Sequence, residues 1–141
     1  MNSRVLFGAI IGLTSGIILG LFLKFVQHFS GIKVYTLLLN VDFIPIIGTV
    51  QWSELTEFSF HLCVSILLGV IYILIPKTKT RPFITSFILT LPTIPLFYQL
   101  IHLSIKEIVD LAHVTAFLWW TIGHLFFAIS MAVLYIVFHK K

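Results

Sequence analysis

Four long apolar stretches constrain the fold of this chain more than any other feature of its sequence. A helix needs ~20 apolar residues to cross the hydrocarbon core of a membrane. Every backbone N–H and C=O group at that depth must be bonded within the protein, which a helix achieves by itself. We therefore predict a single all-α domain, residues 1–141, with four transmembrane helices. The predicted spans run from about 5 to 26, 58 to 75, 83 to 105 and 114 to 138.

The composition agrees with a protein embedded in lipid. Of the 141 residues, 59% are hydrophobic and 10% are charged, whereas a soluble domain has ~25% charged residues. The net charge of +4 does not indicate nucleic-acid binding, because the basic residues occur at the ends of the apolar stretches rather than on one face. The single cysteine, Cys63, excludes an internal disulfide. We expect the lipid bilayer to be the main partner.

The basic residues predict the orientation of the helices. With four spans, both termini and the connection between the second and third spans share one side. That side receives six basic residues: Arg4, Lys77, Lys79, Arg81, Lys140 and Lys141. The opposite side receives Lys33, Lys106 and all five acids: Asp42, Glu54, Glu57, Glu107 and Asp110. Short loops rich in Lys and Arg remain cytoplasmic, so we predict that both termini of this multi-pass membrane protein are cytoplasmic.

The connection formed by residues 27–57 is too long for a hairpin and too apolar for a free linker. It contains apolar runs at 37–39 and 43–47. Irregular backbone at membrane depth must be covered by protein or water, so we predict an interfacial outer loop with a short helix and a turn. Trp52, Trp119 and Trp120 suit anchors at the membrane–water interface, where tryptophan is enriched.

A stripe of glycines in the first span predicts close helix packing. The glycines repeat every four residues, at Gly8, Gly12, Gly16 and Gly20. Because glycine has no side chain, another helix can approach the stripe closely. The partner is either another helix of this chain or a helix from a second copy or another membrane protein. The pattern alone does not distinguish these cases.

Histidines inside the apolar stretches predict a functional site. Ionisable groups are rare in spans and mark such sites by default. At ~1.5 Å rise per residue, His61 and His124 both lie roughly 22–24 Å above the inner edge. Glu57 and His102 lie roughly 30 Å above it in straight helices, and proline kinks lower His102. We therefore hypothesise a metal or proton site in the outer half of the bundle, formed by Glu57, His61, His102 and His124.

The helical phase predicts a set of supporting polar residues around these four. Glu54, Glu57 and His61 share one helix face, which continues through Ser65 to Tyr72. Polar side chains of a membrane bundle normally face its interior. The predicted supporting residues are Glu54, Ser65, Tyr72, Gln99 and Thr121.

Several functions fit this pattern. Protons or a divalent metal ion could be handled at the site, as in a small transporter or channel-like module, since histidine with carboxylate suits zinc, iron or manganese. A non-catalytic scaffold or complex subunit could instead dock through the glycine stripe. Paired histidines could also ligate haem iron or serve a membrane enzyme. The sequence has no H-E-x-x-H, G-x-S-x-G or glycine-rich phosphate motif, so no catalytic residue is assigned. A neutral histidine bonded to a neighbouring helix remains an alternative.

Short motifs resemble the YagU-like family of bacterial inner-membrane proteins. In the second span they are Glu57-Phe-Ser-Phe-His61-Leu and Gly69-Val-Ile-Tyr72, the latter running on to Ile75-Pro76-Lys77. The others are Gln99-Leu-Ile-His102, Gly123-His124-Leu-Phe and Gly12-Leu-Thr-Ser-Gly16 followed by Lys24. The resemblance implies that His61, His102 and His124 occupy the histidine positions of a family without an assigned biochemical activity. The chain departs from the family in its shorter and less polar outer loop.

The predicted topology can be tested with reporter fusions. Fusions after Arg81 and after Lys141 should report a cytoplasmic location, and a fusion at Gly48 should report the outer side. The physical reason is the retention of Lys- and Arg-rich loops on the inner side. If the fusions at Arg81 and Gly48 reported the same side, the arrangement of four spans would be wrong.

Overall fold

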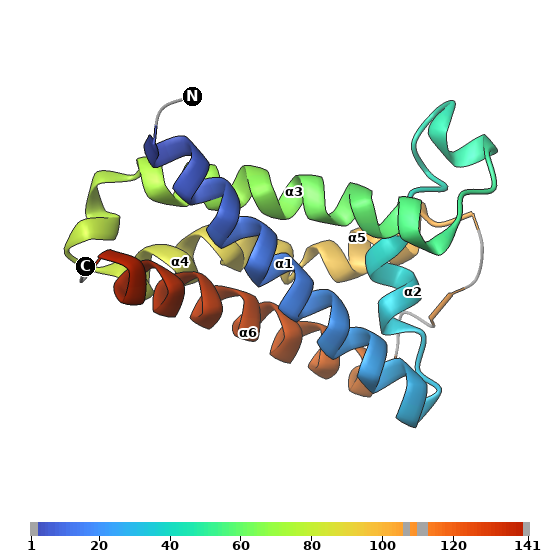
Figure 1. Cartoon of the computed structure of the whole chain (residues 1–141). Coiled ribbons are helices and arrows are strands. Elements are labelled where there is room, and N and C mark those ends of the chain that lie inside the picture. The colour runs from blue at the N-terminus through green and yellow to red at the C-terminus, as the bar shows by residue number, and fades with distance from the viewer. Residues whose placement is uncertain (1–2, 106–107, 110–112, 140–141) are drawn as a thin grey trace.

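The computed structural model describes residues 3–105, 108–109 and 113–139, and all regular structure in this part of the chain is helical. Four of its segments are long and apolar enough to cross a membrane, which confirms the predicted all-α class and the four spans. The helices are α1 (Ser3–Ser30), α2 (Val34–Leu39), α3 (Glu54–Leu74), α4 (Pro82–Thr90), α5 (Leu96–Leu103) and α6 (Val114–His139) (Figure 1). Short 3₁₀ turns are η1 (Ile47–Thr49), η2 (Pro76–Lys79) and η3 (Leu91–Thr93).

The long helices run side by side along the bundle (Figure 1). α1 packs most extensively against α3 and then against α6, while α4 packs against α6. The first turn of α1 and the last turn of α6 lie at the end where η2 joins α3 to α4, which we call the η2 end (Figure 1). α2 and the end of α5 lie at the opposite end, which we call the α2 end (Figure 1).

The glycine stripe of α1 lies against α3. A methyl group added at Gly8, Gly12, Gly16 or Gly20 would come within less than 3.0 Å of α3 atoms. At Gly12 the obstacle is the backbone of Ser65 and Ile66, whereas at Gly20 it is the ring of Phe58. The close approach is therefore made inside this chain, and at Gly12, where backbone meets backbone, it leaves no room for a side chain.

The third span is broken rather than continuous. We expected one helix with kinks, but α4 ends at Thr90 and α5 begins at Leu96, with η3 between them. Pro92 and Pro95 explain the break, because proline has no N–H to donate and its ring clashes with the preceding turn of a helix. The break exposes backbone groups in the middle of the third span, where they need partners from elsewhere in the protein.

The connection between α1 and α3 folds onto the bundle. Val34 and Leu37 of α2 are fully buried, and Gln27 at the end of α1 bonds both the backbone N–H and the hydroxyl of Thr36. Asn40 then donates to the hydroxyl of Ser104, 3.0 Å away, just after α5. These bonds hold the connection against two different spans, so it covers the α2 end of the bundle.

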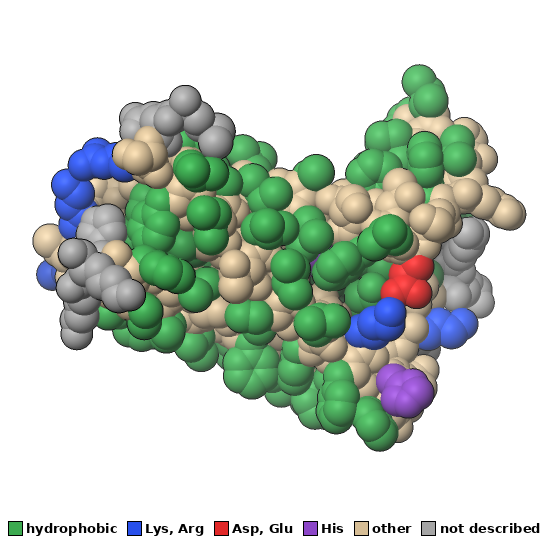
Figure 2. All heavy atoms as spheres, in the orientation of Figure 1, with side chains coloured by type: hydrophobic (Ala, Val, Ile, Leu, Met, Phe, Trp, Pro, Cys, Tyr) green, Lys and Arg blue, Asp and Glu red, His purple; other side chains and the backbone are tan. Residues whose placement is uncertain are grey.

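Charged side chains lie at the two ends of the bundle, and hydrophobic side chains cover the surface between them (Figure 2). The η2 end carries basic side chains, including Lys77, Lys79 and Arg81. At the α2 end Lys24 forms an ion pair with Glu54, with 2.5 Å between Nζ and Oε1. Five charged residues used for the topology lie outside the described part of the chain: Lys106, Glu107, Asp110, Lys140 and Lys141.

A pair of glycine substitutions tests the packing of α1 on α3. Gly12→Ala should destabilise the protein by ~1–3 kcal/mol, because the new methyl group meets rigid backbone and forces the helices apart. Gly20→Ala is the matched control, since the ring of Phe58 can rotate and alanine favours the helix by ~1 kcal/mol. Thermal unfolding in the same detergent should show a lower midpoint for Gly12→Ala alone. Equal midpoints for the two variants would contradict this packing.

Candidate functional site

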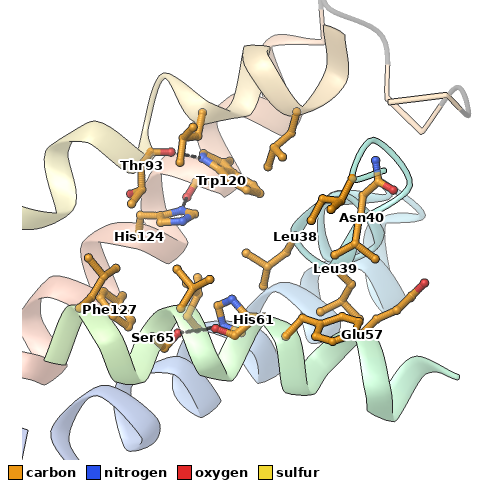
Figure 3. Close-up of a pocket in the computed structure, with 18 of the residues that line it drawn as sticks. Leu38, Leu39, Asn40, Glu57, His61, Ser65, Thr93, Trp120, His124 and Phe127 are labelled. Carbon is orange, nitrogen blue, oxygen red and sulfur yellow. Dashed lines mark hydrogen bonds between the residues drawn. The ribbon is translucent and has the colours of Figure 1, made fainter. Parts of the chain in front are cut away.

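A cavity of about 240 Å³ lies among α3, α6, the break in the third span and the connection that covers the α2 end. We call it the histidine cavity, because His61 from α3 and His124 from α6 both line it (Figure 3). Most of its wall is apolar: Leu19, Leu38, Leu39, Val64, Leu68, Leu96, Leu100 and Phe127 are among the lining residues. Polar groups are few, so those present decide which chemistry the cavity can support.

His124 is held by its own helix. Its side chain is 5% exposed, and Nδ1 donates to the carbonyl oxygen of Trp120, 2.8 Å away (Figure 3). A carbonyl only accepts hydrogen bonds, so Nδ1 carries the proton and Nε2 is the acceptor of the neutral ring. Nε2 has no hydrogen-bond partner among the described residues. The cavity therefore has an imidazole nitrogen available for a proton or for a donor group.

His61 is held by the neighbouring helix α1. Its Nε2 donates to the carbonyl oxygen of Gly16, 3.1 Å away, which leaves Nδ1 as the acceptor of the neutral ring. The hydroxyl of Ser65 lies 3.5 Å from Nε2 and bonds the His61 carbonyl at 3.1 Å. Since Gly16 has no side chain, α3 comes close enough for this bond. The glycine stripe thus positions one of the two histidines.

Glu57 lies one helical turn from His61, toward the α2 end. It is half-buried and lines the histidine cavity as well as two neighbouring hollows. Figure 3 shows its carboxylate extending away from His61, toward the end of the bundle. Glu57 therefore lies where the cavity meets the surface of the α2 end, while the histidines lie deeper.

The break in the third span forms one wall of the cavity. Phe97 and Tyr98 donate their backbone N–H groups to Ile94 and Pro95, so the Thr93 carbonyl receives no bond from the α5 backbone. Trp120 donates its indole N–H to this oxygen at 2.9 Å (Figure 3). Trp120 thus connects the broken span with α6, and its own carbonyl accepts the bond from His124.

Other predicted site residues lie elsewhere. His102 and Gln99 are exposed on α5 and do not line the histidine cavity. Thr121 donates to the Phe117 carbonyl inside α6, and Tyr72 donates to the Pro82 carbonyl near the η2 end. Among the predicted supporting residues, only Ser65 bonds a site histidine within the described chain. The prediction that His102 and Gln99 face the interior of the bundle is therefore wrong.

Glu54 belongs to a separate polar cluster at the α2 end. Its carboxylate pairs with Lys24 and accepts a bond from the Tyr35 hydroxyl at 3.0 Å. Burial raises the pKa of Tyr35, and the bond to Glu54 raises it further, so the phenol stays protonated and remains the donor. The cluster joins α1, α2 and α3 and does not line the histidine cavity.

The sequence analysis missed the role of Trp120. We expected an anchor at the membrane interface, but this side chain is 2% exposed and bonds the Thr93 carbonyl. The prediction for Trp120 is therefore wrong. Two prolines three residues apart, at 92 and 95, were the available signal, because they leave carbonyl groups that need donors from another helix.

The polar donors and acceptors deep in the cavity are mainly two imidazole rings. Within residues 3–105, 108–109 and 113–139, no group of three or more His, Cys, Asp and Glu side chains could hold a metal ion. Two imidazole nitrogens with free lone pairs can instead accept protons or hydrogen bonds. Histidine is the side chain whose unperturbed titration lies closest to neutral pH.

Comparison with protein-family models, with curated protein sequences and with solved structures found no match to this chain. The resemblance to the YagU-like family therefore stays a prediction from short motifs.

Removal of the Trp120 indole N–H tests the support of the broken span. Trp120→Phe should destabilise the protein by ~1–3 kcal/mol, because the Thr93 carbonyl loses its donor inside an apolar environment. Trp119→Phe is the matched control, since no hydrogen bond from the Trp119 indole is found among the described residues. Chemical or thermal unfolding in detergent measures both. A loss of stability in Trp119→Phe equal to that in Trp120→Phe would contradict the role of this bond.

Proposed function

We propose that this protein handles protons at an intramembrane site formed by His61 and His124, with Glu57 at its edge. The protein would be a small transporter or channel-like module of the bacterial plasma membrane. One observation carries the proposal: histidines from two spanning helices line one cavity, each with one ring nitrogen bonded to a backbone carbonyl. The other ring nitrogen of each has no hydrogen-bond partner among the described residues.

The fixed tautomers support this proposal. The carbonyls of Gly16 and Trp120 accept from His61 and His124, and these bonds hold each ring in one orientation. A proton arriving at the free nitrogen converts the ring to imidazolium while the existing bond is kept. Each histidine can thus gain and lose a proton without breaking its attachment to the bundle.

The path to the surface would pass Glu57. This carboxylate lines both the histidine cavity and the neighbouring hollows of the α2 end, whose walls also include Glu54 and Asp42. A carboxylate at the edge of a cavity attracts protons and cations toward it. By the distribution of basic residues, the α2 end would face the outer side of the membrane.

The scaffold alternative would need a surface other than the glycine stripe. α3 already lies against all four glycines, so a partner helix could dock there only by displacing it. A divalent metal ion held by three or more side chains would need ligands beyond those that the described residues bring together. Proton handling needs no additional ligand, so it is the function that the geometry supports best.

Proton uptake into proteoliposomes containing the purified protein and a trapped pH dye tests the proposal. His61→Gln and His124→Gln should each lower uptake by roughly 10²-fold, because the amide keeps an N–H donor for the backbone carbonyl but does not titrate. Uptake in the unsubstituted protein should persist when chelator is present on both sides of the membrane.

His102→Gln is the matched control, because His102 is exposed on α5 and lines neither the histidine cavity nor the neighbouring hollows. It should leave uptake unchanged. Unchanged uptake in both cavity variants, or an equal loss in His102→Gln, would overturn the proposal. Thermal unfolding of each variant separates a loss of folding from a loss of proton transfer.

A further inference from the structure

A second hollow lies near the η2 end, on the surface formed by α4 and the turn before it. It has a volume of about 450 Å³ and runs from Lys77 and Arg81 along Ile84, Ile88, Leu89 and Pro92. We call it the basic groove. Its two cations come from the connection between α3 and α4, and its other lining residues are apolar except Thr85. A groove with charge at one end and apolar walls along its length matches an amphipathic molecule.

The dimensions of the basic groove fit one leaflet of a membrane. Arg81 and Pro92 are eleven residues apart, which corresponds to roughly 16 Å along a helix. Half of the hydrocarbon core measures ~15 Å. With Lys77 and Arg81 at the level of the lipid headgroups, the apolar residues therefore extend over the depth of one acyl chain. Ile84 and Ile88 are 51% and 66% exposed, so a chain could lie directly against them.

Within the described part of the chain, no carboxylate pairs with either cation of the groove. The sequence has no Asp or Glu between Glu57 and Glu107, and all five acids lie between residues 42 and 110. The ion pair found among the described residues joins Lys24 to Glu54 at the opposite end. Both Lys77 and Arg81 are exposed, and neither makes an ion pair within the described chain. Their natural counter-ion is therefore supplied from outside the protein.

We propose that the basic groove is a binding site for an anionic phospholipid of the leaflet next to the η2 end. The phosphate would accept hydrogen bonds from Lys77 and Arg81, and one acyl chain would lie along Ile84, Ile88 and Pro92. Basic pockets beside transmembrane helices bind anionic headgroups in this way. The site is independent of the histidine cavity, which α3, α6 and the α2 end enclose.

Native mass spectrometry of the full chain in a nonionic detergent tests this site. Dioleoyl phosphatidylglycerol should bind more tightly than dioleoyl phosphatidylcholine, which has the same chains and no net charge. Lys77→Gln and Arg81→Gln should each weaken binding of the anionic lipid about fivefold, the effect expected for one basic residue near a membrane surface. Both residues are exposed and unpaired in the described chain, so the variants should fold, and size-exclusion chromatography checks this.

Lys79→Gln is the matched control, because Lys79 lies in the same connection and outside the basic groove. It should leave the affinity for the anionic lipid unchanged. Equal affinity for the two lipids, or an equal loss in Lys79→Gln and Lys77→Gln, would overturn the proposal. Glycerol phosphate should bind much more weakly than the intact lipid. If it bound as tightly, the site would recognise a free phosphate group and the apolar part of the groove would have no role.

Discussion

The approach of α3 to α1 along the glycine stripe determines the position of much of the bundle. At Gly12 and Gly69 the two helices meet backbone to backbone, so neither can rotate or slide without a clash. That contact brings the His61 ring within 3.1 Å of the Gly16 carbonyl. A side chain at position 16 would push α3 away and remove the bond that orients this histidine. The orientation of His61 in the site therefore depends on the close packing of α1 against α3.

The break in the third span has a comparable role on the other side of the histidine cavity. A continuous helix would satisfy its own backbone and would pack as a rod against α6. Pro92 and Pro95 prevent this, and the Thr93 carbonyl is bonded instead by Trp120. The same residue accepts the bond from His124. The break in the third span therefore orients two side chains of α6. Trp120 bonds the Thr93 carbonyl, and His124 bonds the carbonyl of Trp120.

The separation of charge along the bundle explains why the two proposed sites differ in chemistry. The described acids, Asp42, Glu54 and Glu57, lie at the α2 end, where Glu57 adjoins the histidine cavity. At the η2 end no carboxylate of the described residues pairs with Lys77 or Arg81, and the basic groove lies there. One end is thus suited to attract protons and cations, and the other is suited to bind an anion. Both features follow from the order of charged residues in a four-span chain.

The sequence by itself determined the class of the fold and the approximate bounds of the spans, because apolar length and backbone satisfaction in lipid leave few alternatives. It also placed His61 and His124 at similar depth, since rise per residue along a helix is constant. The partner of the glycine stripe, the burial of Trp120 and the outward position of His102 were decided only by tertiary structure. These features depend on which helices are neighbours in the bundle and on the course of the chain after the proline break. Periodicity along a single helix contains no information about its neighbours, and helical phase does not carry across a break.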